Sequence, residues 1–140
     1  MIRTIKEKHT NAEMCDMLMS TEDIMEKARG TFAYALARNV RRLTDAAQEF
    51  MITRNDLLHE YGVEDEDGTV KLKIDSEGFA EFAKRIEPLT TISYDVEITK
   101  ITRDDIPEDM SATEILNIIW MILEEAPEPE VVKEETVING

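Results

Sequence analysis

The stretch "LARNVRRLTDAAQEFMITRNDLLHEYG", residues 36–62, decides the fold of this chain. Its core-type positions return at alternating intervals of four and three residues, and they are Leu36, Val40, Leu43, Ala47, Phe50, Arg54, Leu57 and Tyr61. This interval is the heptad seam of a helix that packs lengthwise against other helices. Gly62 follows where a glycine commonly ends a helix. The sequence therefore predicts a long helix that ends at Tyr61, with Leu43 and Phe50 buried against another helix.

Two helix-start signals precede this seam. The segment "TNAE", residues 10–13, has the form of a capping box, and "STED", residues 20–23, places acids in a first helical turn. A helix from residue 21 to residue 61 would be about 60 Å long, whereas a domain of this size has a radius of gyration of roughly 14 Å. The helix must therefore project, split at Gly30, or lie along a second long helix. Residues 1–8 fit either a frayed end or a short strand.

Downstream of the seam, alternating apolar and polar residues predict two strands. The first is "TVKLKID", residues 69–75, and the second lies in "TTISYDVEITKIT", residues 90–102. In the second strand four residues are expected to face the core, namely Ile92, Tyr94, Val96 and Ile98. We expect the two strands to pair into a small antiparallel sheet with one wet face.

Two further helices complete the predicted fold. One begins at a Ser76 cap and stops before Pro88, and the other begins at the capping box "SATE", residues 111–114, and runs to Leu123. The fold class is therefore α+β: a long helix or helical hairpin packed with a small antiparallel sheet and a C-terminal apolar helix. Residues 1–125 form one domain. Residues 126–140 are acidic, contain two prolines and lack periodicity, which predicts a mobile tail.

Charge narrows the classes of partner. The chain has 31 acidic and 16 basic residues among 140, a net charge of −15, so its surface repels nucleic acid and anionic membranes and attracts basic proteins. Residues 27–54 hold six basic against two acidic residues, whereas residues 104–140 hold eleven acidic residues against Lys133 alone. A basic helix can grip phosphate, but Arg41 and Asp45 are spaced to pair with each other. We expect no direct binding to nucleic acid and none to membranes.

Residues suited to catalysis or metal binding are few. Asp56 and His59 lie three apart on one helix face, but the sequence contains no second element that would complete a metal site. Cys15 lacks a surrounding nucleophile motif, and His9 lies in no recognisable pattern. We predict no enzyme activity, no cofactor and no metal. The single cysteine suits a reducing compartment and no signal peptide is evident, so the expected location is the cytoplasm.

Several segments carry a resemblance to a known group of proteins. They are "AYALARNVRRL", "EYGVEDEDGTV", "DVEITKI" and "SATEILNIIWMIL", in this order, and together they span roughly residues 30–123. This arrangement resembles small bacteriophage and prophage proteins of unknown function. The resemblance implies a phage or mobile-element origin and brings no activity with it.

Two acidic loops are the candidate binding residues, because loops at the ends of rigid elements commonly hold binding residues. They comprise Glu64, Asp65, Glu66, Asp67, Asp104, Asp105, Glu108 and Asp109. We expect both loops to help form one face that binds a basic protein, for example a host nuclease, by mimicking nucleic acid as inhibitors of CRISPR or restriction enzymes do. The alternative is a self-assembling phage structural or assembly protein that uses the seam residues Leu36, Val40, Leu43, Phe50 and Leu57.

Overall fold

The computed structural model describes residues 2–123. In chain order its elements are β1 (Ile2–Thr10), α1 (Asn11–Thr21), the 3-10 helix η1 (Met25–Lys27), α2 (Gly30–Tyr61), β2 (Val63–Glu64), β3 (Val70–Lys71), α3 (Glu77–Thr90), β4 (Ser93–Ile101), the 3-10 helix η2 (Arg103–Asp105), α4 (Ala112–Asn117) and the 3-10 helix η3 (Ile119–Met121). The predicted α+β class is confirmed. The predicted tail, residues 126–140, lies outside the described residues.

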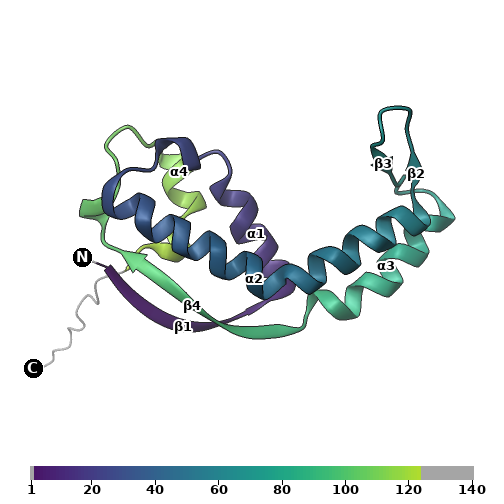
Figure 1. Cartoon of the computed structure of the whole chain (residues 1–140), viewed down its shortest axis with the longest axis horizontal. Helices are drawn as coiled ribbons and strands as arrows, with labels where there is room; N and C mark the ends of the chain where they lie inside the picture. The colour runs from purple at the N-terminus through teal and green to yellow at the C-terminus, as the bar shows by residue number, and fades with distance from the viewer. Residues whose placement is uncertain (1, 124–140) are drawn as a thin grey trace, which may run out of the picture.

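Helix α2 sets the shape of the molecule. Its 32 residues make a rod about 48 Å long, which runs from one end of the molecule to the other (Figure 1). Its first half packs in a body with α1, α4 and the β1–β4 ribbon. Its second half packs against α3 and projects as an arm, defined here as residues 50–90, with the β2–β3 hairpin at the far end (Figure 1).

The predicted interruption at Gly30 marks the beginning of α2. The helix predicted from residue 21 does not form, because α1 extends to Thr21 and a turn with η1 separates it from α2. Gly30 has φ +55°, a left-handed conformation that glycine adopts at little cost, and this lets the chain turn sharply into the rod. The long helix therefore both starts at Gly30 and projects.

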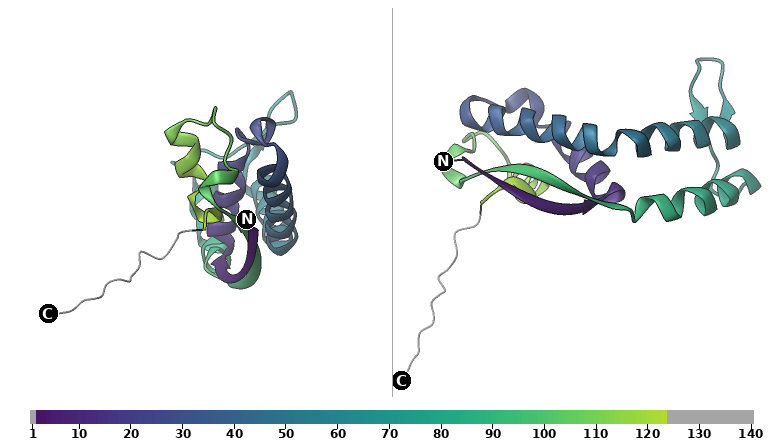
Figure 2. Two further views of the ribbon diagram at one scale, coloured as in Figure 1. Left: turned by 90° about the vertical axis from the view of Figure 1, so that its left-hand side faces the viewer. Right: turned by 60° about the horizontal axis from the view of Figure 1, so that its bottom comes forward.

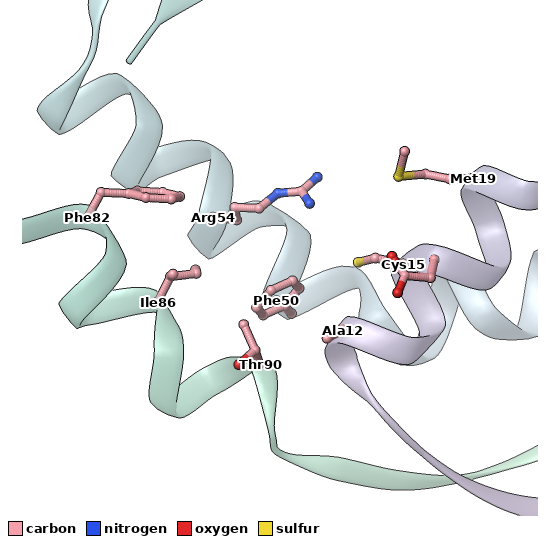
Figure 3. A pocket seen from close by; sticks show the side chains of 9 residues that line it. Ala12, Cys15, Met19, Phe50, Arg54, Phe82, Ile86 and Thr90 are labelled. Carbon is pink, nitrogen blue, oxygen red and sulfur yellow. The ribbon is translucent and has the colours of Figure 1, made fainter. Parts of the chain in front are cut away.

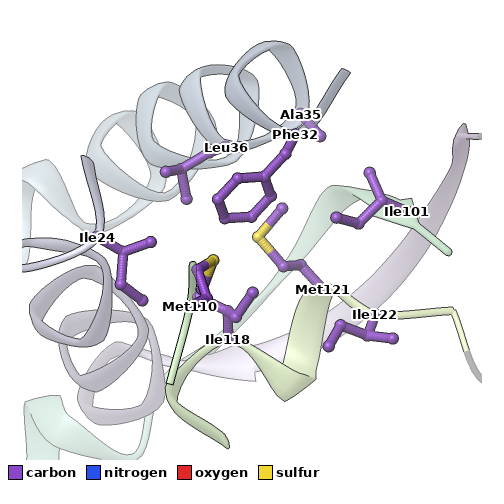
Figure 4. Close-up of a cluster of buried hydrophobic side chains, with 9 residues drawn as sticks. All are labelled: Ile24, Phe32, Ala35, Leu36, Ile101, Met110, Ile118, Met121 and Ile122. Atoms are coloured by element: carbon purple, nitrogen blue, oxygen red, sulfur yellow. The ribbon is translucent and has the colours of Figure 1, made fainter. Parts of the chain in front are cut away.

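The seam of α2 packs against other elements of the same chain, as predicted. Leu43 and Ala47 are buried in a cluster with Met14 and Met17 of α1 and with Val96 and Ile98 of β4. Phe50 is 7% exposed where α2 meets α1 and α3. A second cluster joins the start of α2 to the C-terminal segment, and Figure 4 shows Phe32 and Leu36 facing Met110, Ile118 and Met121.

The predicted pairing of the sheet is wrong. Residues 1–8 were expected to be a frayed end or a short strand. Residues 2–10 form β1, which pairs antiparallel with β4 over nine residues in the register Ile5↔Ile98. The segment 69–75 yields only the two-residue β3, which pairs with β2. Its Ile74 is 80% exposed. The reason is distance: β3 lies at the end of the arm, whereas β4 returns along the body (Figure 1).

Other boundaries also differ from those predicted. Of the four residues of this segment expected in the core, Val96 and Ile98 are buried. Ile92, which precedes β4, and Tyr94 are exposed because they lie before the part of the ribbon that the helices cover. Helix α3 continues through Pro88 to Thr90. Its last turn is held from outside, since the Asn11 amide donates to the Leu89 carbonyl at 2.9 Å.

The closing helix is shorter than predicted. Helix α4 ends at Asn117, and Ile118 leaves helical geometry with φ −117° and ψ +18° before η3 begins. This change of direction places Ile118, Met121 and Ile122 together in the core cluster with Phe32. The break lets the chain run beside β4, where Ile122 forms a bridge with Ile101 and the Leu123 amide donates to the Ile101 carbonyl at 2.6 Å.

Candidate functional site

The end of the arm is the first candidate site, and a tight turn shapes it. The Asp65 amide donates to the Thr69 carbonyl at 2.7 Å, and the Gly68 amide donates to the Asp65 carbonyl at 3.0 Å. Gly68 has φ +86°, which favours glycine at this position. Gly62 seats the hairpin on α2, because a Cβ there would lie 2.6 Å from the Leu58 carbonyl oxygen. The acidic tip is therefore fixed to the rod by close backbone contact.

The four acids of the tip have two different roles. Asp65 forms an ion pair with Lys71 at 3.0 Å. Asp67 accepts a hydrogen bond from the Thr69 amide at 3.1 Å, and this bond holds the pKa of Asp67 below its usual range. Glu64 and Glu66 are exposed and make no ion pair among residues 2–123. Two acids thus stabilise the turn, and the other two are exposed to solvent.

The two helices of the arm are joined by a polar cluster near the tip. Arg85 of α3 donates to Glu60 at 3.0 Å and to the Tyr61 hydroxyl at 3.1 Å, and its guanidinium lies over the Tyr61 ring. Together with burial of Leu57, these contacts hold α3 along α2. Residues 50–90 contain ten acidic and five basic residues, a net charge of −5.

The second predicted acidic group lies at the opposite end of α2. Ile106 and Met110 pack on the cluster that contains Phe32, near the start of α2, while the hairpin follows its last residue (Figure 1). Asp104, Glu108 and Asp109 are exposed there, and Asp105 accepts from the Thr102 backbone and hydroxyl. The two acidic loops therefore do not form one continuous face, and each must be considered separately.

A hollow of about 240 Å³ lies where the arm meets the body. Figure 3 shows Cys15 and Met19 of α1 on one side, Phe50 and Arg54 of α2 on the second, and Phe82 and Ile86 of α3 on the third. The Arg54 guanidinium lies over the Phe50 ring at 5.9 Å. Burial raises the pKa of the Cys15 thiol, although Arg54 acts in the opposite direction. Such a thiol is a poor nucleophile at neutral pH.

The arginines of α2 are largely committed to contacts within the chain. Arg42 donates to the Glu97 carbonyl at 3.4 Å and to the Thr99 hydroxyl at 3.3 Å. Arg38 donates to the Tyr34 hydroxyl at 2.8 Å and lies over its ring. These contacts tie Arg42 to β4 and Arg38 to its own helix, whereas Arg41 is exposed and forms no ion pair among residues 2–123.

The histidines also have structural contacts. His9 lies 2.8 Å from Glu7 and 3.5 Å from Glu13, while His59 contacts the Asn55 carbonyl at 2.9 Å. Within the part of the chain that the structure describes, no three side chains of the His, Cys, Asp or Glu type converge as a metal site would require. In that same part, none of the helices is both long and apolar enough to cross a bilayer.

Sequence reasoning missed one polar residue that organises the body. Asn39 lies beside the seam residue Val40, three residues after Leu36 and four before Leu43, and it is fully buried. Its side chain pairs with both backbone groups of Thr99 in β4. An asparagine among the apolar residues of this helix face was the available signal, since a buried amide must find hydrogen-bond partners.

Comparisons with known proteins add no relative. The chain matches no protein-family profile, no curated protein and no solved structure at a significant level.

Proposed function

We propose that this protein is a non-enzymatic binding protein whose acidic arm occupies a basic, nucleic-acid-binding groove of another protein. The partner class is a host nuclease, and the effect is inhibition of the anti-CRISPR or anti-restriction type. The phage or mobile-element origin belongs to this proposal. The observation that supports it best is the form of the arm, in which two braced helices project from the body and end in a fixed acidic hairpin (Figure 2).

The charge of the arm is of the right order for this role. Helix α3 has 14 residues and is about 21 Å long. Duplex DNA of that length carries about 12 phosphate charges, at one per 1.7 Å of axis. The arm carries ten acids, and its net charge is −5. Its acids thus approach the number of phosphates, while the net charge is under half of theirs, so we expect the densest part, the tip, to dominate binding.

The seam-based alternative fits this geometry less well. Leu36, Leu43, Phe50 and Leu57 are at most 7% exposed within a single chain, and Val40 packs against the first core cluster. A contact between copies through these side chains would require the body and the arm to open.

The test compares the two ends of the molecule. The tip variant carries Glu64→Lys and Glu66→Lys, which leaves Asp65 and Asp67 in their turn contacts. The matched control carries Asp104→Lys and Asp109→Lys, with the same change in charge at the opposite end. Each chain is immobilised and exposed to host-cell lysate, and captured proteins are identified by mass spectrometry.

We expect the wild-type chain to capture a nucleic-acid-binding protein, and we expect duplex DNA and rising salt to release that protein. The tip variant should bind it at least tenfold more weakly at low salt, about 1.4 kcal/mol. The control should bind it nearly as well as wild type, because its reversed charges lie far from the tip. The net charge changes equally in the tip variant and the control, so a difference between these two reports on the tip itself. Equal binding by wild type and tip variant, or release by salt but not by DNA, would overturn the proposal.

A further inference from the structure

The two edges of the β1–β4 ribbon differ in how far the rest of the chain covers them. At the outer edge of β4, the Thr99 amide donates to Asn39 at 2.7 Å, and the Asn39 amide donates to the Thr99 carbonyl at 2.8 Å. The Ile101 carbonyl accepts from the Leu123 amide at 2.6 Å. The Glu97 carbonyl accepts from Arg42. From Glu97 to Ile101, the outer edge of β4 is therefore covered by side chains of α2 and by the C-terminal segment.

These bonds also fix the direction of the backbone groups of β1. In an antiparallel ladder, directly opposite residues point their backbone groups either at each other or both away. Glu97, Thr99 and Ile101 point away from β1, so their opposite residues point away from β4. Those opposite residues are Lys6, Thr4 and Ile2. By the same alternation Lys8 also points outward.

The outer edge of β1 is uncovered in the described structure. No hydrogen bond to the backbone of Thr4, Lys6 or Lys8 from outside the ribbon is present among residues 2–123. The strand has nine consecutive pairs, without a bulge or a proline. Its first part lies at the outline of the molecule in Figure 1, and the strand lies at the outline in the right-hand view of Figure 2. A long, regular, unpaired edge is a template for another strand.

The side chains of β1 are complementary to a second β1 in one register. Two antiparallel copies centred on Ile5 place Ile5 opposite Ile5 and Arg3 opposite Glu7 of the other copy. Arg3 gains most from this, because within one chain it faces Lys100 and forms no ion pair among the described residues. Opposite charges placed directly across strands stabilise a pair, and like charges destabilise it.

The same register keeps the lysines apart. It places Lys6 opposite Thr4 and Lys8 opposite Ile2, and these are the outward-pointing residues whose backbone groups must bond across the seam. A register centred on residue 6 would put Lys6 opposite Lys6, and one centred on residue 7 would put Lys6 opposite Lys8. Charge therefore selects the register centred on Ile5 from the long self-pairings available.

We propose that two copies of this protein pair through the outer edges of β1, in the register centred on Ile5, to form a four-stranded antiparallel sheet. Because β1 runs towards the arm from the opposite end of the body (Figure 1), a twofold antiparallel pair directs the two arms in opposite directions. Each copy has a net charge of −15. Their mutual repulsion is screened by salt, so pairing is stronger at high salt than at low salt.

The experiment measures the mass of the full chain by sedimentation across a series of concentrations, at low and at high salt. Wild type should change from monomer to dimer with concentration, at a lower concentration in high salt. Lys6→Pro should be a monomer, because it removes an outward N–H while leaving the bonds to β4 intact. Lys6→Ala is the matched control and should form dimers like wild type.

A second variant guards against misfolding of the proline variant. Arg3→Glu should keep the fold, since the new carboxylate faces Lys100 in its own chain, but it faces Glu7 of the second copy and should weaken pairing at least tenfold. Amide hydrogen exchange gives an independent measure. Protection of Thr4, Lys6 and Lys8 should increase with protein concentration, while Arg3 and Ile5 are protected throughout.

Three results would overturn the pairing. The first is a monomeric wild type under all conditions. The second is a dimer whose stability is unchanged by both Lys6→Pro and Arg3→Glu. The third is protection of the Thr4, Lys6 and Lys8 amides that is independent of concentration, which would mean that another segment of the same chain covers the edge. None of these results bears on the arm, so this inference stands or falls independently of the proposed function.

Discussion

Replacing Asn39 by alanine should be among the most destabilising single changes in the body. The side chain is fully buried, and it donates to the Thr99 carbonyl at 2.8 Å and accepts from the Thr99 amide at 2.7 Å. Thr99 is itself fully buried. The amide therefore satisfies two backbone groups that water does not reach in the native state.

The size of the effect follows from these contacts. A buried backbone group left without a partner costs about 1–3 kcal/mol, and alanine leaves two such groups together with a small void. Entry of water recovers part of this, so we expect a loss of about 3–4 kcal/mol in the free energy of unfolding. At roughly 4 °C per kcal/mol for a chain of this length, the melting temperature should fall by about 12–16 °C.

Urea and thermal unfolding followed by circular dichroism measure this loss. Asn55→Ala is the matched control, because Asn55 is exposed on the same helix, and it should change stability by no more than about 0.5 kcal/mol. Asn39→Asp adds a sharper test. At neutral pH it places a buried carboxylate against the Thr99 carbonyl. Burial raises a carboxyl pKa, so the folded form binds a proton more tightly and the variant gains stability as pH falls. An Asn39→Ala variant within 0.5 kcal/mol of wild type would refute this reasoning.

Two further predictions concern α2 and the hollow beside it. Leu43→Ala should lower the free energy of unfolding by about 2–5 kcal/mol and Phe50→Ala by about 3–5 kcal/mol, as measured by urea denaturation; a change of a degree or two in melting temperature would contradict their burial. Because burial raises the pKa of the Cys15 thiol, its alkylation by iodoacetamide should be slower at neutral pH than that of a free cysteine and should still increase above pH of about 8.5. Reaction as fast as that of free cysteine at neutral pH would show an activated thiol.

The long helix was predictable because its signal is local and repeated. The seam from Leu36 to Tyr61 specifies a helical face over seven turns, and Gly30 and Gly62 mark its ends as glycine does elsewhere. Burial of Leu43 and Phe50 follows from the same spacing. A helix that must bury one face along its whole length packs that face against the elements beside it, here α1, α3 and β4.

The sheet was not predictable in the same way, because strand pairing depends on elements far apart in sequence. Residues 2–10 carry charges on both faces, so their alternation is weak as a signal for a strand. Their partner β4 lies more than eighty residues later. Strand β4 pairs with β1 and not with residues 69–75 because of the route of the chain along the arm and back. No local sequence pattern encodes this route.

The acidic sites were predictable in composition but not in arrangement. The tip, residues 64–67, is evident as an acidic run, yet the use of Asp65 and Asp67 within the turn depends on backbone geometry that composition does not reveal. The separation of the tip from residues 104–109 depends on the length and direction of α2. The two acidic loops are thus similar in charge but far apart in space.

The two proposals together make one prediction that neither makes alone. If the tip binds the partner and β1 joins two copies, each dimer presents two tips in opposite directions and can hold two partner molecules. Linked sites increase retention on a densely coated surface without changing the affinity of one site.

Lys6→Pro should therefore bind the captured partner in solution as tightly as wild type, measured per chain by calorimetry. It should dissociate faster than wild type from a surface densely coated with that partner, and at the same rate as wild type from a sparsely coated one. A Lys6→Pro chain with weaker affinity in solution would mean that β1 itself contacts the partner. Equal dissociation from the dense surface would mean that the two tips act separately.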